Sequence, residues 1–112
     1  VVYEHGVVRQ RITVNRMVEL LSTNPAKLFG LYPKKGTVAV DTDADLTVFD
    51  PDLQRKITTN TLHSEVNWSP YEGMVVRGWA TNVVSRGDVV MADGRLKANP
   101  GRGLFLRRSP LK

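Results

Sequence analysis

The chain has 112 residues, of which 41% are apolar and 24% charged, with a formal net charge of +5 and no cysteine. This length is enough for one small domain, and the composition is ordinary for a soluble globular protein. The apolar runs are far shorter than the roughly 20 residues of a membrane-spanning helix, and the first residues lack a secretory signal pattern. The absence of cysteine excludes disulfides and thiolate metal sites and favours a cytoplasmic location.

The positive charge is concentrated at the C-terminal end. Residues 95–112 contain six basic residues and no acidic one, whereas residues 1–94 sum to −1. Such a tail can bind phosphates, an acidic membrane surface or an acidic patch on a partner subunit. Its single aromatic residue and the lack of a preceding basic helix argue against nucleic acid, so we favour a solvated or subunit-contacting tail and expect no membrane partner. The six basic residues are Arg95, Lys97, Arg102, Arg107, Arg108 and Lys112.

The first predicted helix begins after Thr13, a residue type that caps helix N-termini. The four apolar residues that follow at i, i+3, i+4 and i+7 form the stripe of an amphipathic helix: Val14, Met17, Val18 and Leu21. We expect this helix to end at Ser22 or Thr23.

A second short helix is predicted to start at once. Asn24 can cap it, and Pro25 can occupy its first position, where a missing N–H costs nothing. Leu28 and Phe29 are expected to face the core, and Gly30 to adopt the left-handed conformation that ends helices.

The pattern then changes to turns and short strands. Residues 32–36 predict a turn, residues 37–40 a short strand, and residues 41–45 a polar turn. Residues 46–49 predict a second strand, ended by Asp50-Pro51.

The remaining chain is predicted to be β. Residues 75–85 form a long strand candidate with a bulge at Gly78. Residues 86–88 turn the chain, residues 89–92 return as its hairpin partner, and residues 93–94 form the next turn. The sequence therefore predicts an α+β chain, with a short helical part followed by a small β-sandwich or barrel.

The acidic turn at residues 41–45 has the D-x-D-x-D opening of a calcium-binding loop. The glycine expected at the sixth position is Leu46, and the glutamate expected at the twelfth is Asp52. We therefore favour a solvated turn between strands over a calcium site.

No catalytic constellation is present in the sequence. The two histidines, His5 and His63, are 58 positions apart, with no H-x-H pattern and no cysteine to complete a metal site. Gly101-Arg102-Gly103 lacks the helix and the Lys-Ser/Thr pair of a phosphate loop. No serine lies in a G-x-S-x-G elbow; the serines are Ser22, Ser64, Ser69, Ser85 and Ser109. We predict no catalytic, cofactor-binding or metal-binding residue in this chain.

Three aromatic residues, Trp68, Tyr71 and Trp79, are candidates for lining a pocket. The loop at residues 68–73 presents two of them beside Glu72. A ligand or subunit contact is one interpretation, and packing of the loop onto the β part is the one we favour.

Four segments occur in a fixed order: NPAKLFGLYPKKGTVAV at 24–40, DADLTVFDP at 43–51, SPYEGM at 69–74 and VSRGDVVMADG at 84–94. With ITVNRMVELLSTNPAK and GRGLFLRR, they closely resemble the C-terminal region of cyclic amidohydrolases, in particular dihydropyrimidinases and D-hydantoinases. The resemblance covers nearly the whole chain. One departure is Asp41, where the family usually has a glycine.

The resemblance implies a TIM-barrel hydrolase with two zinc ions and a composite β-sandwich domain built from N- and C-terminal segments. Such an enzyme opens the ring amide of hydantoins or dihydropyrimidines to N-carbamoyl amino acids. Its metal ligands and substrate-positioning residues lie upstream of anything matching Val1, so this segment is expected to bind no zinc and to be inactive alone. Its partners would be the remainder of the same enzyme and further subunits of a cytoplasmic homotetramer.

The implied organisation has three parts. Residues 1–33 correspond to the terminal barrel helices and their connection, residues 34–94 to the C-terminal part of the β-sandwich, and residues 95–112 to the basic, subunit-contacting tail. Two alternatives stay open: a segment of an allantoinase-type amidohydrolase, and an independent, non-catalytic assembly or binding module.

Overall fold

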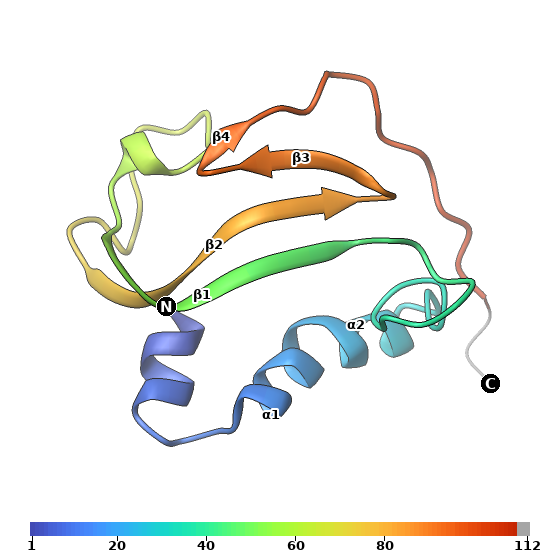
Figure 1. Cartoon of the computed structure of the whole chain (residues 1–112), viewed down its shortest axis with the longest axis horizontal. Coiled ribbons are helices and arrows are strands. Elements are labelled where there is room, and N and C mark those ends of the chain that lie inside the picture. Colours follow the sequence, from blue (N-terminus) through green and yellow to red (C-terminus); the bar gives the residue numbers. More distant parts are fainter. Residues whose placement is uncertain (110–112) are drawn as a thin grey trace.

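The computed structural model describes residues 1–109 (Figure 1). They form an N-terminal helix, a helical arm at residues 14–28 and a four-stranded antiparallel sheet of order β1-β2-β3-β4. In chain order the elements are the π-helix η1 (Tyr3–Val8), the α-helix α1 (Val14–Val18), the π-helix η2 (Glu19–Thr23), the α-helix α2 (Asn24–Leu28), the strand β1 (Leu46–Lys56), the 3-10 helix η3 (Thr59–Thr61), and the strands β2 (Val75–Ser85), β3 (Asp88–Ala92) and β4 (Arg95–Leu96).

The helix α1 begins where the sequence predicts. Thr13 has an extended backbone, with φ −78° and ψ 162°, and its side-chain oxygen accepts a hydrogen bond from the N–H of Arg16 at 3.1 Å. This bond satisfies one of the N–H groups that the first turn of a helix leaves without a partner. The predicted N-cap is therefore confirmed.

Thr13→Ala is expected to lower the free energy of unfolding by about 1 kcal/mol, because the cap hydrogen bond is lost. Urea denaturation followed by circular dichroism measures this change. Thr13→Ser keeps the hydroxyl and should remain close to the parent chain, so equal losses in both variants would show that the cap contributes nothing.

The predicted break between two helices is wrong. Thr23 and Asn24 both keep right-handed helical dihedral angles, and the N–H of Asn24 bonds to the carbonyl of Glu19, five residues earlier. In a regular α-helix the ring of Pro25 would clash with the carbonyl four residues before it. The wider π turn accommodates the proline, so the helix continues and Asn24 is not a cap.

The apolar side chains at the C-terminal end of this helical arm are exposed to solvent in the described residues. The expectation that Leu28 and Phe29 face the core is not met within residues 1–109, where they are 65% and 56% exposed. Ala26 is buried instead, and Gly30 has the predicted left-handed conformation with φ 68°. Among the described residues no Cα atom of α1, η2 or α2 lies within 8 Å of a strand Cα atom, so the arm and the sheet are not in close backbone contact.

The strand predicted for residues 37–40 is not formed. Val38 and Val40 are 81% and 89% exposed, and this segment has no ladder partner among residues 1–109. Isolated extended segments are not stable as strands, because the ladder hydrogen bonds come from a neighbour. The turns on either side are present as predicted, with φ 84° at Gly36 and φ 65° at Asp41.

Strand β1 continues through Asp50-Pro51, where the sequence predicts its end. The pairing with β2 shifts register between Asp50 and Gln54. Within this bulge one carboxylate oxygen of Asp50 accepts the N–H groups of Asp52 at 2.9 Å and Leu53 at 3.1 Å. Proline is tolerated in a strand at such a bulge, because no ladder hydrogen bond is required of it.

Strand β2 has the predicted bounds, and Gly78 lies in the register shift opposite the β1 bulge with φ 88°. The rings of Tyr3 and Phe49 meet there edge to face, with centroids 4.9 Å apart. A carboxylate oxygen of Glu4 accepts the N–H of Arg77 at 2.9 Å. These contacts attach η1 to the sheet.

Two tight turns connect β2, β3 and β4. Arg86 and Gly87 have φ 50° and 83°, and Asp93 and Gly94 have φ 50° and 74°. Two consecutive left-handed residues are typical of the type I′ turns that suit hairpins. Both predicted turns are confirmed. The α+β class is confirmed as well, but residues 1–109 form one sheet, and the second layer of a sandwich is not among them.

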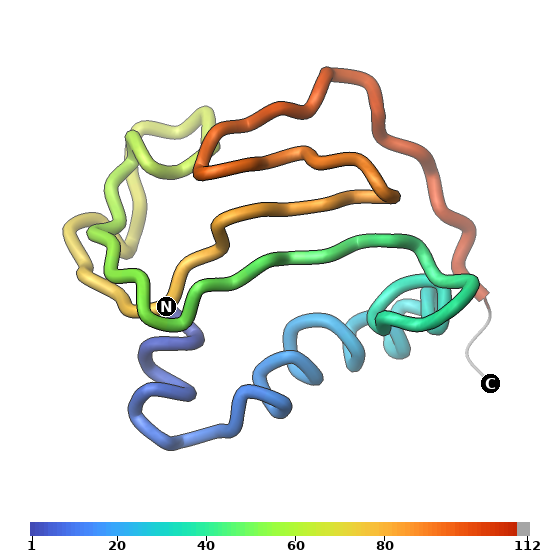
Figure 2. Tube along the Cα trace, viewed as in Figure 1, coloured from blue at the N-terminus to red at the C-terminus, as the bar shows by residue number. Residues whose placement is uncertain are grey.

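The fold has little interior of its own. Among the described residues the buried apolar side chains are Ala26, Ile57 and Val76. The radius of gyration is 15.5 Å, against about 13 Å for a compact domain of this length. In the view of Figure 2 the trace of α1, η2 and α2 runs apart from β1 along most of its length. No helix within residues 1–109 has both the length and the apolarity to cross a bilayer.

Candidate functional site

The acidic turn is bound to a lysine of the same chain. The ammonium group of Lys35 lies 2.8 Å from Oδ2 of Asp43 and also pairs with Asp45. The other carboxylate oxygen of Asp45 accepts the backbone N–H of Arg86 at 2.8 Å. The turn at residues 41–45 is therefore a structural cluster that faces the β2–β3 turn, and it does not lie between two strands as predicted.

The electrostatics of this cluster favour its charged state. Burial opposes charge on both Lys35 and Asp45, but the hydrogen bonds between them outweigh it. The pKa of Asp45 is lowered by the bonds from Lys35 and from the N–H of Arg86. The pKa of Lys35 is raised by its bonds to Asp43 and Asp45.

The lowered pKa of Asp45 makes the stability depend on pH. A carboxyl whose folded-state pKa lies below its unfolded value adds stability above the unfolded pKa and loses it as the pH falls through the folded pKa. We expect Asp45→Asn to be less stable than the parent at about pH 7, and this difference to shrink towards about pH 3. Urea denaturation of both chains across this range measures it; a constant difference would contradict the assignment.

The two histidines are not brought into a metal site. His5 lies in η1 and His63 in the loop after η3. In residues 1–109 there is no group of three or more His, Asp or Glu side chains placed to hold a metal ion. The described residues, 1–109, therefore do not fit a pair of zinc ions.

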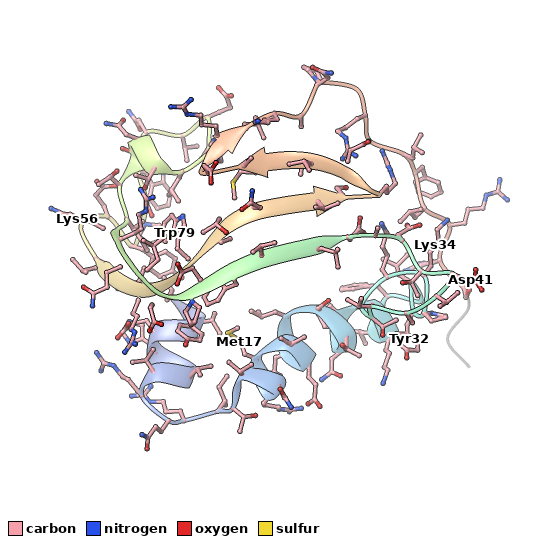
Figure 3. All side chains as sticks on the ribbon, viewed as in Figure 1. Met17, Tyr32, Lys34, Asp41, Lys56 and Trp79 are labelled. Atoms are coloured by element: carbon pink, nitrogen blue, oxygen red, sulfur yellow. The ribbon has the colours of Figure 1, made fainter. Side chains whose placement is uncertain are left out.

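The aromatic candidates are only partly brought together. Trp79 and His63 line one hollow of about 280 Å³ with Arg55, a residue that the sequence patterns did not single out. Trp68 is 65% exposed, so the described residues do not cover this side chain. Figure 3 shows Trp79 and Asp41 at opposite ends of the molecule, so the aromatic and acidic candidates do not form one site.

The carboxylate of the aromatic loop has a structural partner. Glu72 accepts the backbone N–H of Thr59 at 2.8 Å. The same loop is joined to the end of β1 by backbone bonds from Gly73 to Ile57 and from Ile57 to Met74, both 2.8 Å. Glu72 therefore braces the chain around η3.

The basic tail is bound to the sheet through Arg102. Arg102 donates to the carbonyl of Ser85 at 2.7 Å and pairs with Asp88 at 3.2 Å. From residue 97 to residue 109 the tail has no helix or strand, and Leu104 and Phe105 are exposed. Lys112 lies outside the described residues. At least one basic residue of the tail thus serves the fold.

The sequence model of the amidohydrolase family matches residues 2–90, which is most of the chain. The chain belongs to the amidohydrolase family. Its four ordered segments lie within or just beyond this match, so the resemblance in the sequence is confirmed.

Individual relatives indicate which members of the family the chain resembles. The chain is 45% identical to the D-hydantoinase of Geobacillus stearothermophilus, over 97% of this chain and 23% of that protein. It is 42% identical to a D-phenylhydantoinase of Escherichia coli, over 96% of this chain and 23% of that protein. The crystal structure of the dihydropyrimidinase from Brevibacillus agri superposes with a TM-score of 0.93 at 42% identity, over 96% of this chain and 23% of that one.

These similarities have two consequences. The chain spans about a quarter of the length of the relatives it matches. Those relatives are hydantoinases and dihydropyrimidinases, so the allantoinase alternative is not favoured.

The sequence patterns missed the residues that join distant segments. The sequence places Lys35, Asp45 and Arg86 in separate turns, and no spacing rule pairs a residue near position 45 with one near position 86. The only signal in the sequence for these ion pairs is that the turns carry charges of opposite sign.

Proposed function

We propose that the chain is the C-terminal segment of a hydantoinase or dihydropyrimidinase, whose complete protein hydrolyses the ring amide of hydantoins or dihydropyrimidines. Water adds to the ring carbonyl, the C–N bond breaks, and an N-carbamoyl amino acid results. The observation that carries the proposal is the superposition of nearly the entire chain on a dihydropyrimidinase, with a TM-score of 0.93.

We assign the hydrolytic centre to polypeptide outside this chain. The residues described here do not fit a two-zinc site, so no step of the reaction is assigned to them. The segment acts as architecture and is inactive alone.

The exposed apolar surface supports this architectural role. Soluble monomers rarely expose contiguous apolar patches beyond a few hundred Å². The arm, the segment at residues 37–40 and the start of β1 expose Val14, Val18, Leu20, Leu21, Leu28, Phe29, Val38, Val40, Leu46 and Val48. We assign the arm to the end of a TIM barrel, covered by the rest of that barrel.

The unpaired β structure extends the same assignment. Within the part of the chain that the structure describes, β1 has β2 on one side and no strand on the other. An open edge of this kind is a template for another strand. We assign this edge and residues 37–40 to pairing with strands of the remaining protein, which complete a β-sandwich around residues 34–94.

The tail is assigned to subunit contact. The exposed Leu104 and Phe105 support an apolar docking role. Residues 95–112 would then contact a neighbouring subunit of a cytoplasmic homotetramer, while residues 1–33 complete the barrel.

Hydrolysis assays test the proposal. The protein translated from the complete reading frame around Val1–Lys112 should convert a hydantoin or a dihydropyrimidine to its N-carbamoyl amino acid, measured by chromatography of the product. The chain Val1–Lys112 alone should release no product under the same conditions.

The controls separate the two parts of the proposal. Ring opening by Val1–Lys112 alone would overturn the architectural role. A complete, folded and metal-loaded protein that opens neither ring would overturn the assigned reaction.

A further inference from the structure

The backbone of the helical arm, residues 14–28, runs apart from the backbone of the sheet. No Cα atom of α1, η2 or α2 lies within 8 Å of a strand. Its N-terminal end reaches the sheet through η1, which packs on β2. An arm of this length extends about 22 Å from that attachment. A second attachment at the far end is therefore needed to define its direction.

The far end is attached through the loop that follows the arm. The N–H of Gly87 donates to the carbonyl of Ala44 at 3.1 Å, and the N–H of Arg86 donates to Asp45 at 2.8 Å. Both donors belong to the β2–β3 turn, and both acceptors belong to the loop.

Lys35 carries this attachment back to the arm. Its ammonium group pairs with Asp45 and with Asp43, whose Oδ2 is buried. Next to Lys35, the carbonyl of Gly36 accepts the hydroxyl of Thr23, a residue of the arm, at 2.8 Å. The loop is thus cross-linked to both the arm and the turn.

The C-terminal tail makes a second connection between the same two places. Arg86 donates to the carbonyl of Arg102, which in turn donates to the carbonyl of Ser85 at 2.7 Å. At its other end the N–H of Ser109 donates to the carbonyl of Gly30 at 2.8 Å, at the end of the arm. Figure 2 shows this strap, in red, running from the sheet to the loop after α2.

We propose that the β2–β3 turn, residues 86–88, is a joint that fixes the direction of the helical arm relative to the sheet, through the loop tie at Asp45 and the tail tie at Arg102. Arg86 takes part in both ties, by its backbone N–H and by its guanidinium group. The role of the joint in the complete enzyme rests on the proposed function. There the joint sets the angle between the end of the barrel and the β domain.

Distance measurements between spin labels test the joint. The chain has no native cysteine, so Asn24→Cys on the arm and Gln54→Cys on β1 give two specific labels. Double electron–electron resonance on Val1–Lys112 should give one narrow distance peak. Asp45→Ala or Arg102→Ala should each broaden it, and the double variant should broaden it most, because the side-chain bonds of both ties are removed and only bonds to backbone carbonyls remain.

A matched control separates the joint from general loss of ion pairs. Arg16 pairs with Glu19 at 2.9 Å within the arm, so Arg16→Ala should leave the peak unchanged. A narrow peak in the double variant would overturn the joint. A parent chain without a narrow peak, or a double variant without the parent's circular dichroism spectrum, would also overturn it, since the ties are proposed to orient two folded parts. This result is independent of hydrolysis, so it is distinguishable from failure of the proposed function.

Discussion

Gly78→Ala is expected to lower the free energy of unfolding by about 2–5 kcal/mol, from left-handed strain and from overpacking together. Gly78 has φ 88°, and an added Cβ would lie 2.4 Å from a ring carbon of Tyr3 and 2.6 Å from one of Phe49. Those rings attach η1 to the sheet, so their displacement should also loosen the N-terminal end of the arm. Urea denaturation measures the loss.

Gly87→Ala is the matched control for Gly78→Ala. Gly87 has φ 83° and no atom within 4 Å of an added Cβ, so only the strain of about 1–2 kcal/mol should appear. The difference between the variants isolates the steric contact. Equal losses of unfolding free energy in the two variants would show that the Tyr3 and Phe49 rings move aside without destabilising the fold.

Gly36→Ala is expected to cost a similar amount, about 2–5 kcal/mol. Gly36 has φ 84°, and its added Cβ would lie 2.4 Å from the Cβ of Ala26, which is one of the few buried side chains. The contact holds the loop against α2, so the change should separate them. Thermal and urea denaturation of the variant measure the cost.

A compensating change tests the cause of this second loss. Ala26→Gly removes the opposing methyl group, so the double variant Ala26→Gly/Gly36→Ala should recover the steric part. The change at position 26 itself costs about 1 kcal/mol in helix propensity. Gly94→Ala, with φ 74° and no atom within 4 Å, reports the strain alone. Purely additive losses in the double variant would contradict the contact.

Prediction from the sequence succeeded where the cause is local. Thr13, Gly30 and the two hairpin turns have the predicted conformations, because a cap or a left-handed residue depends on two or three neighbours along the chain. The family could also be predicted, because ordered sequence segments with matching gaps can be recognised without knowing how the segments pack.

Prediction failed where a partner decides the structure. Residues 37–40 have a strand pattern but no ladder partner among residues 1–109, and Leu28 has a core pattern but no neighbour to cover it. A pattern states which face an element can bury, and only another element can bury it.

The sequence by itself determined the Thr13 cap, the left-handed Gly30, the two hairpin turns and membership of the amidohydrolase family. The tertiary structure alone decided that the helix runs on through Pro25, that β1 runs on through Pro51, and that Asp45 meets Arg86. The physical reason is that a proline is tolerated when a π turn or a bulge relieves it, and such relief depends on pairing and packing at a distance. Contacts between residues 41 positions apart leave no periodic trace in the chain, so they become visible only once the sheet and the arm are placed together.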